Sequence, residues 1–353
     1  MTPLFEHLSS FEQLYYAFER ARQGKRGQEN VARFERNLEQ ELFDLQDELR
    51  SGAYRPGLYR TFYRTEAKRR LISAAPFRDR VVHHALVAAV EDRFERRFIF
   101  DSYANRVGKG THRALDRCAH FMRSASYVLP CDVRQFFPSI DHALLRAQLA
   151  RVIPEEDVLT VCDRILENGV GVLDEAYAMV WFPGDDLFAA SRPRGLPLGN
   201  LTSQFWANVY LSPLDQFVKR ELKCRRYLRY VDDFLLFAPD KPTLHRWRRA
   251  IIQFLAGLRL TLHEESCQPR PVEVGLPFLG FQVFPDHRRL KRRCGLAFQR
   301  RLKGMLAAYA RGELSLKRLT ASVQGWVAHA AHGNTWGLRR AVLSHVVLPH
   351  PAK

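Results

Sequence analysis

The fold of this chain is decided by the stretch YLRYVDDFLLFA, residues 227–238. Two short apolar runs, Tyr227 to Tyr230 and Phe234 to Ala238, flank Val231-Asp232-Asp233, which predicts two strands joined by a hairpin turn that carries both acids. Asp is common in turns because its side chain bonds the turn backbone, so most Asp-Asp pairs are structural. This pair is bracketed by apolar strands, where two charges without a counter-charge are costly to bury. The setting therefore favours a metal site.

A second predicted strand ends in a carboxylate 100 residues before Asp232. The run Tyr127 to Cys131 is apolar and leads directly to Asp132, as in a buried strand. If the two strands are neighbours in one sheet, Asp132 meets the hairpin acids. Such carboxylates can hold two Mg²⁺ ions roughly 3.5–4 Å apart, which activate an attacking 3′-hydroxyl and neutralise charge on pyrophosphate. We therefore predict a nucleotidyl-transfer site in which Asp132 and Asp232 bridge the ions and Asp233 contributes less.

The rest of the chain alternates helical patterns with strands, which predicts an α+β fold. Apolar residues from Val31 to Leu49 recur every three or four positions before Gly52, so we expect one amphipathic helix with a glycine stop. Further helices are expected from near Arg78 towards Phe98, over residues 144–166 and 247–258, and along the tail from Arg300 to Leu348. No repeat or flexible linker divides the chain.

Composition favours a phosphate-rich partner. The chain has 353 residues, 46% of them hydrophobic, enough for one multi-lobed unit or two domains. The 55 Lys and Arg against 38 Asp and Glu give a formal charge of +17, which favours nucleic acid, although such an excess also serves solubility alone. Six scattered cysteines without a C-x-x-C pair indicate reduced core thiols. With neither a signal layout nor an apolar run that could span a bilayer, we expect a cytoplasmic location and no membrane partner.

The densest basic run lies near the C-terminus. Residues 288–293 (RRLKRR) are followed by Arg300, Arg301 and Lys303, with Phe284 and Phe298 nearby. Cations interleaved with aromatic rings suit a groove that follows a nucleic-acid backbone. Taken alone, the run is equally typical of a solvated helix face or loop.

Six motifs follow one another along the chain. They are KRRLI (68–72) with Pro76 and DRVV (79–82), SYANR (102–106) with GKGT (108–111), DVRQFFPSID (132–141), RGLPLGNLTSQ (194–204), YVDD (230–233) and FLGF (278–281). In this order they resemble the motifs of the reverse transcriptase family: two in the fingers, the first catalytic strand, a palm motif beneath the nascent base pair, the Y-x-D-D hairpin and the primer grip. The basic helical tail resembles the family's thumb.

The resemblance implies an RNA-directed DNA polymerase shaped like a right hand, with fingers, a palm of antiparallel sheet backed by helices, and a short helical thumb. It assigns catalysis to Asp132, Asp232 and Asp233, and it assigns two Mg²⁺ ions, with Mn²⁺ as a substitute, to Asp132, Val133, Asp232 and Asp233. The implied contacts to the incoming dNTP are Lys68, Arg70, Phe136, Phe137, Leu198 and Gly199. Those to primer and template are Phe278, Leu279, Gly280, Arg292, Arg293, Arg300 and Arg301.

Each implied contact has a physical interpretation. Cations at Lys68 and Arg70 suit a triphosphate, and Phe137 matches an aromatic gate that excludes a 2′-hydroxyl by its volume. Surface cations and a buried core Phe are the alternatives.

The same resemblance divides the chain into regions. N-terminal helices and fingers are expected over 1–125, the first catalytic strand of the palm over 126–144, and fingers and palm helices with an insertion over 145–193. The palm with the Y-x-D-D hairpin and primer grip is expected over 194–285, and the basic helical thumb over 286–353.

Two residues of the palm motif point to a particular group. Many relatives have Gln before its glycine and Pro after its serine, whereas this chain has Leu198 before Gly199 and Gln204 after Ser203. The pattern resembles the reverse transcriptases of diversity-generating retroelements, within the group II intron and retron superfamily, which implies frequent errors opposite template adenines. An apolar side chain cannot offer the nascent pair the hydrogen bonds of an amide, so Leu198 and Gln204 are the expected fidelity residues. Alternatively, Leu198 is only a packing residue and has no effect on fidelity.

Other functions stay open. One is a group II intron-like or retron-like enzyme of ordinary fidelity, although the sequence has no Cys/His-rich endonuclease module. Another is a non-catalytic RNA-binding scaffold, and an RNA polymerase-like enzyme is disfavoured by Phe137. Where relatives place a Lys that protonates pyrophosphate, this chain has Ser266, with His263 as a nearby substitute.

The expected partners are template RNA, primer and cDNA, dNTPs, and a small basic accessory protein within a ribonucleoprotein. Six acids of the N-terminal region form a candidate docking face for that accessory protein, with a solvated helix surface as the alternative. They are Glu35, Glu39, Glu41, Asp44, Asp47 and Glu48.

Overall fold

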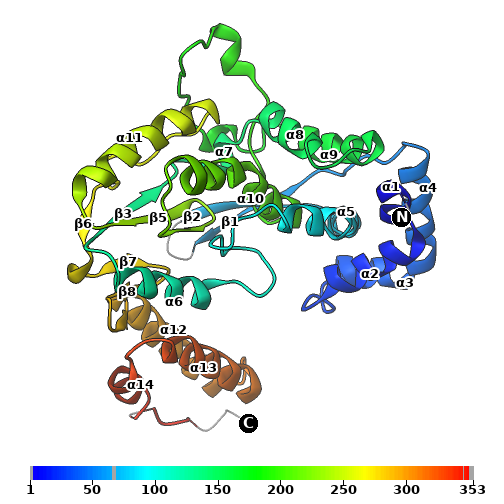
Figure 1. Ribbon diagram of the computed structural model, residues 1–353. Coiled ribbons are helices and arrows are strands. Elements are labelled where there is room, and N and C mark those ends of the chain that lie inside the picture. The colour runs from blue at the N-terminus through cyan, green and yellow to red at the C-terminus, as the bar shows by residue number, and fades with distance from the viewer. Residues whose placement is uncertain (1–2, 66–68, 345, 350–353) are drawn as a thin grey trace.

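The computed structural model describes residues 3–65, 69–344 and 346–349. A central sheet lies between layers of helices, the N-terminal helices lie at its right, and the last helices form a lobe below it (Figure 1).

The central sheet carries the predicted hairpin. Its four strands are antiparallel to their neighbours in the order β4-β5-β3-β6. Their bounds are β3 (Tyr127–Asp132), β4 (Tyr227–Tyr230), β5 (Asp233–Ala238) and β6 (Arg270–Pro271). Leu236 of β5 pairs with Tyr227 on one side and with Leu129 on the other. The two predicted strands around Val231 and Asp232 are therefore confirmed, as is the strand that leads to Asp132.

Alternate side chains of β5 enter two different cores. Phe234 and Leu236 pack in the core shared with α10 (Leu201–Gln216) and α11 (Lys241–Gly257). Leu235 and Phe237 enter the core shared with α6 (Thr111–Met122) and the C-terminal elements. This alternation follows from the two-residue period of a strand. Because both faces of the sheet are covered (Figure 1), its strands read as nearly continuous apolar runs.

Four N-terminal helices pack around α5 (Phe77–Glu95). They are α1 (Leu4–Leu8), α2 (Phe11–Arg22), α3 (Glu29–Arg36) and α4 (Leu38–Arg50). The expectation of one helix from Val31 to Leu49 is wrong, because Asn37 leaves helical geometry at φ −116° and ψ 35° and divides it in two. The apolar positions on both sides of the break are still buried, and Gly52 follows the second helix at φ +72°.

The region between the helices and the palm contains a hairpin that the pattern did not predict. Strands β1 (Arg60–Thr65) and β2 (Arg69–Ala74) pair antiparallel, with Arg60 opposite Ala74. Most of their side chains are exposed, so no run of buried apolar residues marks them.

The helix expected over 144–166 is also two helices. They are α8 (His142–Ala150) and α9 (Glu156–Asn168), which follow the short α7 (Phe136–Ser139). Pro154 lies between them, and proline disfavours helix at the residue before it. The following segment, 169–193, forms the green excursion at the top of Figure 1 and contains only the short turns η1 (Asp174–Ala176) and η2 (Leu187–Ser191).

A second small sheet leads from the palm to the C-terminal helices. Its strands are β7 (Leu276–Phe278), β8 (Phe281–Val283) and β9 (Arg288–Leu290), and the short helical turns η3 (Phe217–Glu221) and η4 (Val272–Val274) lie earlier in the chain. The lobe that follows consists of α12 (Arg292–Ala310), α13 (Leu316–Ala331) and α14 (Trp336–Leu343). The basic run 288–293 is therefore divided between a strand and the start of a helix.

Two general expectations can be compared with these elements. All six cysteines are free, and five of them are buried, in agreement with reduced core thiols. Within the described ranges, no helix combines the length and the apolar character needed to cross a membrane.

Candidate active site

The central sheet brings the three predicted catalytic acids to one end. β3 and β5 pair so that Asp132 lies directly opposite Asp233. Asp232 occupies the turn between β4 and β5, and its carbonyl accepts a hydrogen bond from the Val133 N–H at 3.4 Å. Residues that are 100 positions apart in the sequence are thus neighbours in the structure.

The turn has an uncommon backbone conformation. Val231 has a φ of 57°, in the left-handed region that costs an L-residue about 1–2 kcal/mol and that β-branched side chains rarely adopt. The Val231 carbonyl accepts a hydrogen bond from Arg229 Nη1 at 3.0 Å. A contact from the preceding strand therefore supports the strained residue.

Charge and burial distinguish the three acids. Asp132 and Asp232 are partly buried, whereas Asp233 is exposed. Burial raises the pKa of Asp232 and the charge of Asp132 raises it too, while a backbone hydrogen bond, Arg70 and Arg229 lower it. Neighbouring carboxylates of this kind repel each other, and a bound cation relieves the repulsion.

The donor set fits a hard divalent cation. Mg²⁺ is usually held by one or two carboxylates and completes its shell with water and substrate phosphates. Asp132 and Asp232 meet that requirement. In the part of the chain that the structure describes, no three His, Cys, Asp or Glu side chains are gathered closely enough to hold a metal by themselves.

The two phenylalanines after Asp132 begin α7. Phe136 is buried and Phe137 is partly exposed, and their rings meet edge to face with centroids 5.3 Å apart. The Leu196 N–H donates to the Phe137 carbonyl at 2.9 Å, which joins α7 to the loop that carries Leu198. The structure thus connects three of the predicted dNTP contacts, and their role stays a prediction.

Leu198 and Gly199 lie against the β1–β2 hairpin. The Ser73 N–H of β2 donates to the Leu198 carbonyl at 2.8 Å, and the Asn200 amide donates to the Ser73 carbonyl at 2.9 Å. Gly199 has a φ of 113°, and a Cβ there would lie 2.9 Å from Ile72 Cγ2, so any other residue at this position would be strained.

The remaining predicted dNTP and fidelity residues are more scattered. Arg70 is exposed on β2, although its charge acts on Asp232. Gln204 is exposed on α10. Lys68 lies outside the described residues.

A cleft of about 390 Å³ joins the acids to the predicted primer grip. Asp132 and Asp233 line it together with Phe278, Leu279 and Gly280. Leu279 and Gly280 have φ values of 43° and 88°, so the strand pair β7–β8 turns sharply at the cleft wall.

Three cations line the same cleft, and among them only Arg293 was predicted as a primer or template contact. They are Arg270, Lys291 and Arg293. Lys291 belongs to the basic run, which was a usable signal, and Asp233 is close enough to oppose the lowering of its pKa by burial. Nothing in the sequence marks Arg270, which enters through the pairing of β6 with β3. The other predicted primer and template contacts, Arg292, Arg300 and Arg301, are exposed on α12 and do not line this cleft.

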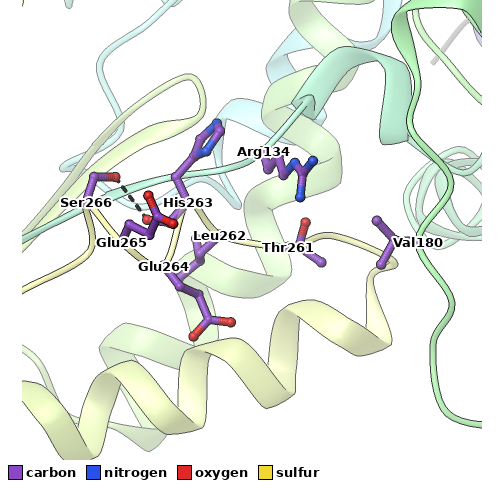
Figure 2. Close-up of a pocket in the computed structure, with 8 residues that line it drawn as sticks. All are labelled: Arg134, Val180, Thr261, Leu262, His263, Glu264, Glu265 and Ser266. Atoms are coloured by element: carbon purple, nitrogen blue, oxygen red, sulfur yellow. Dashed lines mark hydrogen bonds between the residues drawn. The ribbon is translucent and has the colours of Figure 1, made fainter.

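A second cleft, of about 610 Å³, follows the chain beyond Asp132. Arg134, Val180 and residues 261–266 line it (Figure 2). The His263 N–H donates to the Asp132 carbonyl at 3.0 Å, and the Ser266 hydroxyl donates to the His263 carbonyl at 2.9 Å. Both residues considered for pyrophosphate protonation therefore border this cleft, and Ser266 also lines the first one.

An antiparallel sheet covered by helices, with an acid-bearing hairpin paired to a second acidic strand end, defines the palm of a template-directed polymerase. Residues 63–283 match the family described as reverse transcriptase (RNA-dependent DNA polymerase). This match covers more than half of the sequence, and the chain belongs to the reverse transcriptase family. The predicted fold class is thereby confirmed.

Individual relatives agree with this membership. The chain is 25% identical over 304 residues to protein YkfC of Escherichia coli strain K12, and the match covers 75% of each protein. It is 24% identical over 183 residues to the group II intron-encoded protein LtrA of Lactococcus lactis subsp. cremoris, which covers 51% of this chain and 28% of LtrA. Among solved structures, apo telomerase from Candida tropicalis is similar with a TM-score of 0.50 and 11% identity, over 81% of this chain and 56% of that one. The last likeness concerns the fold alone.

Proposed function

We propose that this chain extends a DNA 3′ end on a template RNA, with Asp132 and Asp232 as its principal metal-holding carboxylates and Asp233 and Val133 beside them. The observation that carries the proposal is the pairing of β3 with β5, which sets Asp132 opposite Asp233. Two bound Mg²⁺ ions, or Mn²⁺ in their place, would supply activation of the 3′-hydroxyl and offset charge on the leaving pyrophosphate. The chain itself holds the carboxylates at one sheet end, and its neighbouring cleft offers cations to the primer backbone.

The catalytic assignment is tested by RNA-templated primer extension with purified protein. Asp232→Asn and Asp132→Asn should each lower the extension rate roughly 10²–10³-fold. Each substitution removes one carboxylate charge from the metal site, which weakens metal binding by several kcal/mol. Asp240→Asn is the matched control. Asp240 caps α11 by accepting from the Thr243 N–H at 2.7 Å, and Asn caps equally well. Undiminished extension by Asp232→Asn would remove the assignment.

The dNTP contacts form part of the same proposal. Phe137 is proposed as the gate beneath the sugar, with Lys68, Arg70, Phe136, Leu198 and Gly199 as further contacts. Phe137→Ala should raise ribonucleotide incorporation relative to deoxyribonucleotide incorporation, measured as the ratio of the two kcat/KM values. Because Phe136 is the more buried of the pair, Phe136→Ala should mainly lower stability instead.

We further propose that the enzyme is of the diversity-generating type and errs at template adenines. Support comes from Leu198 and Gln204 in the palm motif. Sequencing of cDNA made on a defined RNA tests this, and Leu198→Gln should reduce errors opposite adenine if an amide restores discrimination at the nascent pair. The rival is a group II intron-like enzyme of ordinary fidelity, which the likeness to LtrA favours. Errors spread evenly over the four template bases would support the rival.

The proposed partners are the template RNA, dNTPs and a small basic accessory protein. Three of the six acids suggested for docking already form ion pairs, Glu35 with Arg22 and both Glu41 and Glu48 with Arg78. Glu39, Asp44 and Asp47 are exposed and make the better candidates. Loss of co-purification after Glu39→Lys with Asp47→Lys would support the docking face.

We also propose the boundaries of the regions that make up the polymerase. The N-terminal helices and fingers are assigned to 1–125, the palm to 126–144 and 194–285, fingers and palm helices with an insertion to 145–193, and the basic helical thumb to 286–353. A non-catalytic RNA-binding scaffold is the remote alternative. Under that alternative, RNA binding would persist in EDTA and no extension product would form when Mg²⁺ is restored.

A further inference from the structure

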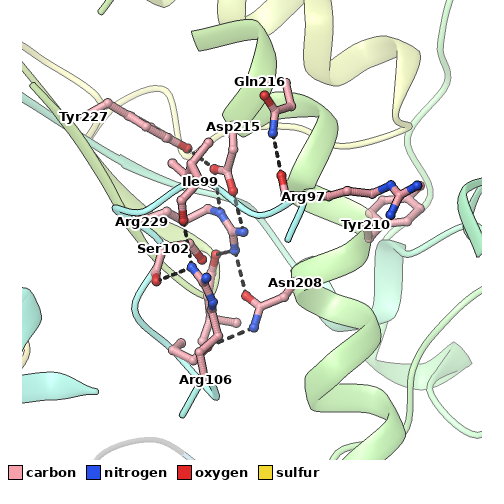
Figure 3. Close-up of polar contacts among 12 residues, drawn as sticks. Arg97, Ile99, Ser102, Arg106, Asn208, Tyr210, Asp215, Gln216, Tyr227 and Arg229 are labelled. Carbon is pink, nitrogen blue, oxygen red and sulfur yellow. Dashed lines mark hydrogen bonds and ion pairs between the residues drawn. The ribbon is translucent and has the colours of Figure 1, made fainter. Parts of the chain in front are cut away.

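A fully buried ion pair lies beside the catalytic hairpin. The side chains of Arg229 on β4 and Asp215 on α10 are both 0% exposed. The guanidinium donates to the two Asp215 oxygens at 2.8 and 2.7 Å, a bidentate geometry that Arg offers and Lys does not. The Tyr227 hydroxyl donates to the same carboxylate at 2.7 Å (Figure 3). Both oxygens of the buried Asp215 carboxylate therefore accept hydrogen bonds.

The third nitrogen of Arg229 reaches the turn that bears Asp232. Arg229 Nη1 donates to the Val231 carbonyl at 3.0 Å and to Asn208 Oδ1 at 3.1 Å. Val231 directly precedes Asp232 and has a φ of 57°. A residue persists in this region only when its surroundings enforce the conformation. Arg229 is therefore a side-chain contact that ties the strained residue of the turn to α10, in addition to the backbone contacts of the turn with β3.

The cluster is anchored from two directions. Asn208 and Asp215 are seven residues apart on α10, so two helical turns put both on the same face. The Asn208 amide donates to the Ala104 carbonyl at 2.8 Å. The Arg229 backbone N–H donates to the Asp101 carbonyl, and the Arg229 carbonyl accepts from the Tyr103 N–H, both at 2.9 Å. The network thus joins α10, the hairpin and the loop around residues 99–106 (Figure 3).

We propose that Arg229 is a positioning residue: clamped by Asp215, it holds the Val231 carbonyl and thereby fixes the direction in which Asp232 leaves the turn. Replacing a buried ion pair by apolar residues of similar volume is often neutral for stability, so stability alone does not account for the pair. The inference deepens the proposed polymerase function and rests on it, because the residue that is positioned is a proposed metal-holding carboxylate.

The sharpest test separates positioning from folding. The triple variant Arg229→Met, Asp215→Leu, Tyr227→Phe removes the whole charged cluster and leaves no buried charge unpaired. Its melting temperature should stay within a few degrees of the parent. We expect backbone amides of residues 230–234 to exchange hydrogen about tenfold faster, Mn²⁺ titrated by calorimetry to bind about tenfold more weakly, and turnover to fall about 10²-fold, as for an approximately 1 Å misplacement.

A second variant and a control keep the test decisive. Arg229→Lys retains the charge and loses the fork, and it should shift exchange and Mn²⁺ affinity in the same direction by less. Arg22→Lys is the matched control, since the Arg22 side chain on α2 is 13% exposed and donates to Glu19 at 3.1 and 2.7 Å, outside this network. It should leave hairpin exchange and Mn²⁺ affinity unchanged.

The outcomes distinguish this inference from the proposed function. Unchanged hairpin exchange and Mn²⁺ affinity in the triple variant would overturn the positioning role, whatever happens to turnover. If the triple variant does not fold, the same two measurements on Arg229→Lys decide. If the parent protein extends no primer but both measurements still respond, the polymerase proposal fails and the positioning of the hairpin stands.

Discussion

Gly199 has a φ of 113° and directly follows Leu198 in the loop that packs on β2. A side chain there faces two penalties, backbone strain and a Cβ that would lie 2.9 Å from Ile72 Cγ2. We expect Gly199→Ala to lower the free energy of unfolding by about 1–3 kcal/mol. Single-nucleotide incorporation should fall as well, because the loop that carries Leu198 must move away from the β1–β2 hairpin. Denaturant unfolding and primer extension measure the two effects.

The matched control for this substitution is Gly304→Ala. Gly304 lies within α12, and a Cβ there would meet nothing within 4 Å. Alanine should therefore stabilise the protein by up to about 1 kcal/mol. If Gly199→Ala is as stable and active as the parent, the contact between the loop and β2 does not hold Leu198 in place.

At the scale of elements, helix α5 places His83 in the core and the partly buried His84 next to it. His83 is 1% exposed, and burial lowers its pKa to about 3, while burial lowers the pKa of His84 to about 4. In the unfolded chain a histidine titrates near 6.5, so below that pH the unfolded state binds more protons than the folded state. The stability contributed by neutral His83 is complete above pH 6.5 and is lost as the pH falls towards 3. We expect His83→Leu to recover about 2 kcal/mol of the stability lost between pH 6.5 and 5.

Urea unfolding at pH 7.5, 6.5 and 5.0 measures this effect. His245→Leu is the control, because His245 is exposed on α11. A stability profile for His83→Leu that runs parallel to the parent's over this range would show that acid destabilisation arises elsewhere.

Elements with unbroken apolar patterns were predictable from the sequence, and elements defined by tertiary partners were not. The strands β3, β4 and β5 were predicted because buried strands read as apolar runs that end at acids. The break at Asn37 was missed because the apolar spacing continues across it. The hairpin β1–β2 and strand β9 carry mostly charged or exposed residues, and their pairing depends on backbone hydrogen bonds that leave no periodic signal.

The candidate site shows the same division. The three acids stand out because charges at the ends of apolar strands are unusual, and the structure sets Asp132 opposite Asp233. The sequence did not mark Arg229 as buried, because arginine is mostly exposed unless it is paired. Its partner Asp215 lies on another element, so the pair cannot be read from the local sequence. The run of cations that contains Lys291 was visible in the sequence, but the sequence does not show which members of the run face the cleft.

At the scale of the whole molecule, the C-terminal lobe is continuous with the palm. Leu235 and Phe237 of β5 share a core with Phe281 of β8, Phe298 of α12 and Trp326 of α13. The Phe298 and Trp326 rings stack with centroids 4.1 Å apart. The basic face of α12 is thus presented by a packed lobe, so its cations have a defined place relative to the acids.

We therefore expect the salt dependence of nucleic-acid binding to come from the cations of α12 in particular, as well as from the total charge of +17. Arg300 and Arg301 are exposed on α12, and we expect Arg300→Gln with Arg301→Gln to reduce the slope of log Kd against log salt by about 1–2, close to one per lost phosphate contact. Fluorescence anisotropy of a labelled RNA–DNA primer–template over 50–300 mM KCl measures the slope. Arg33→Gln with Arg36→Gln, on α3, removes the same net charge far along the chain and should change the slope little. Equal losses in the two double variants would mean that binding responds to total charge, and α12 would then have no special part in holding the duplex.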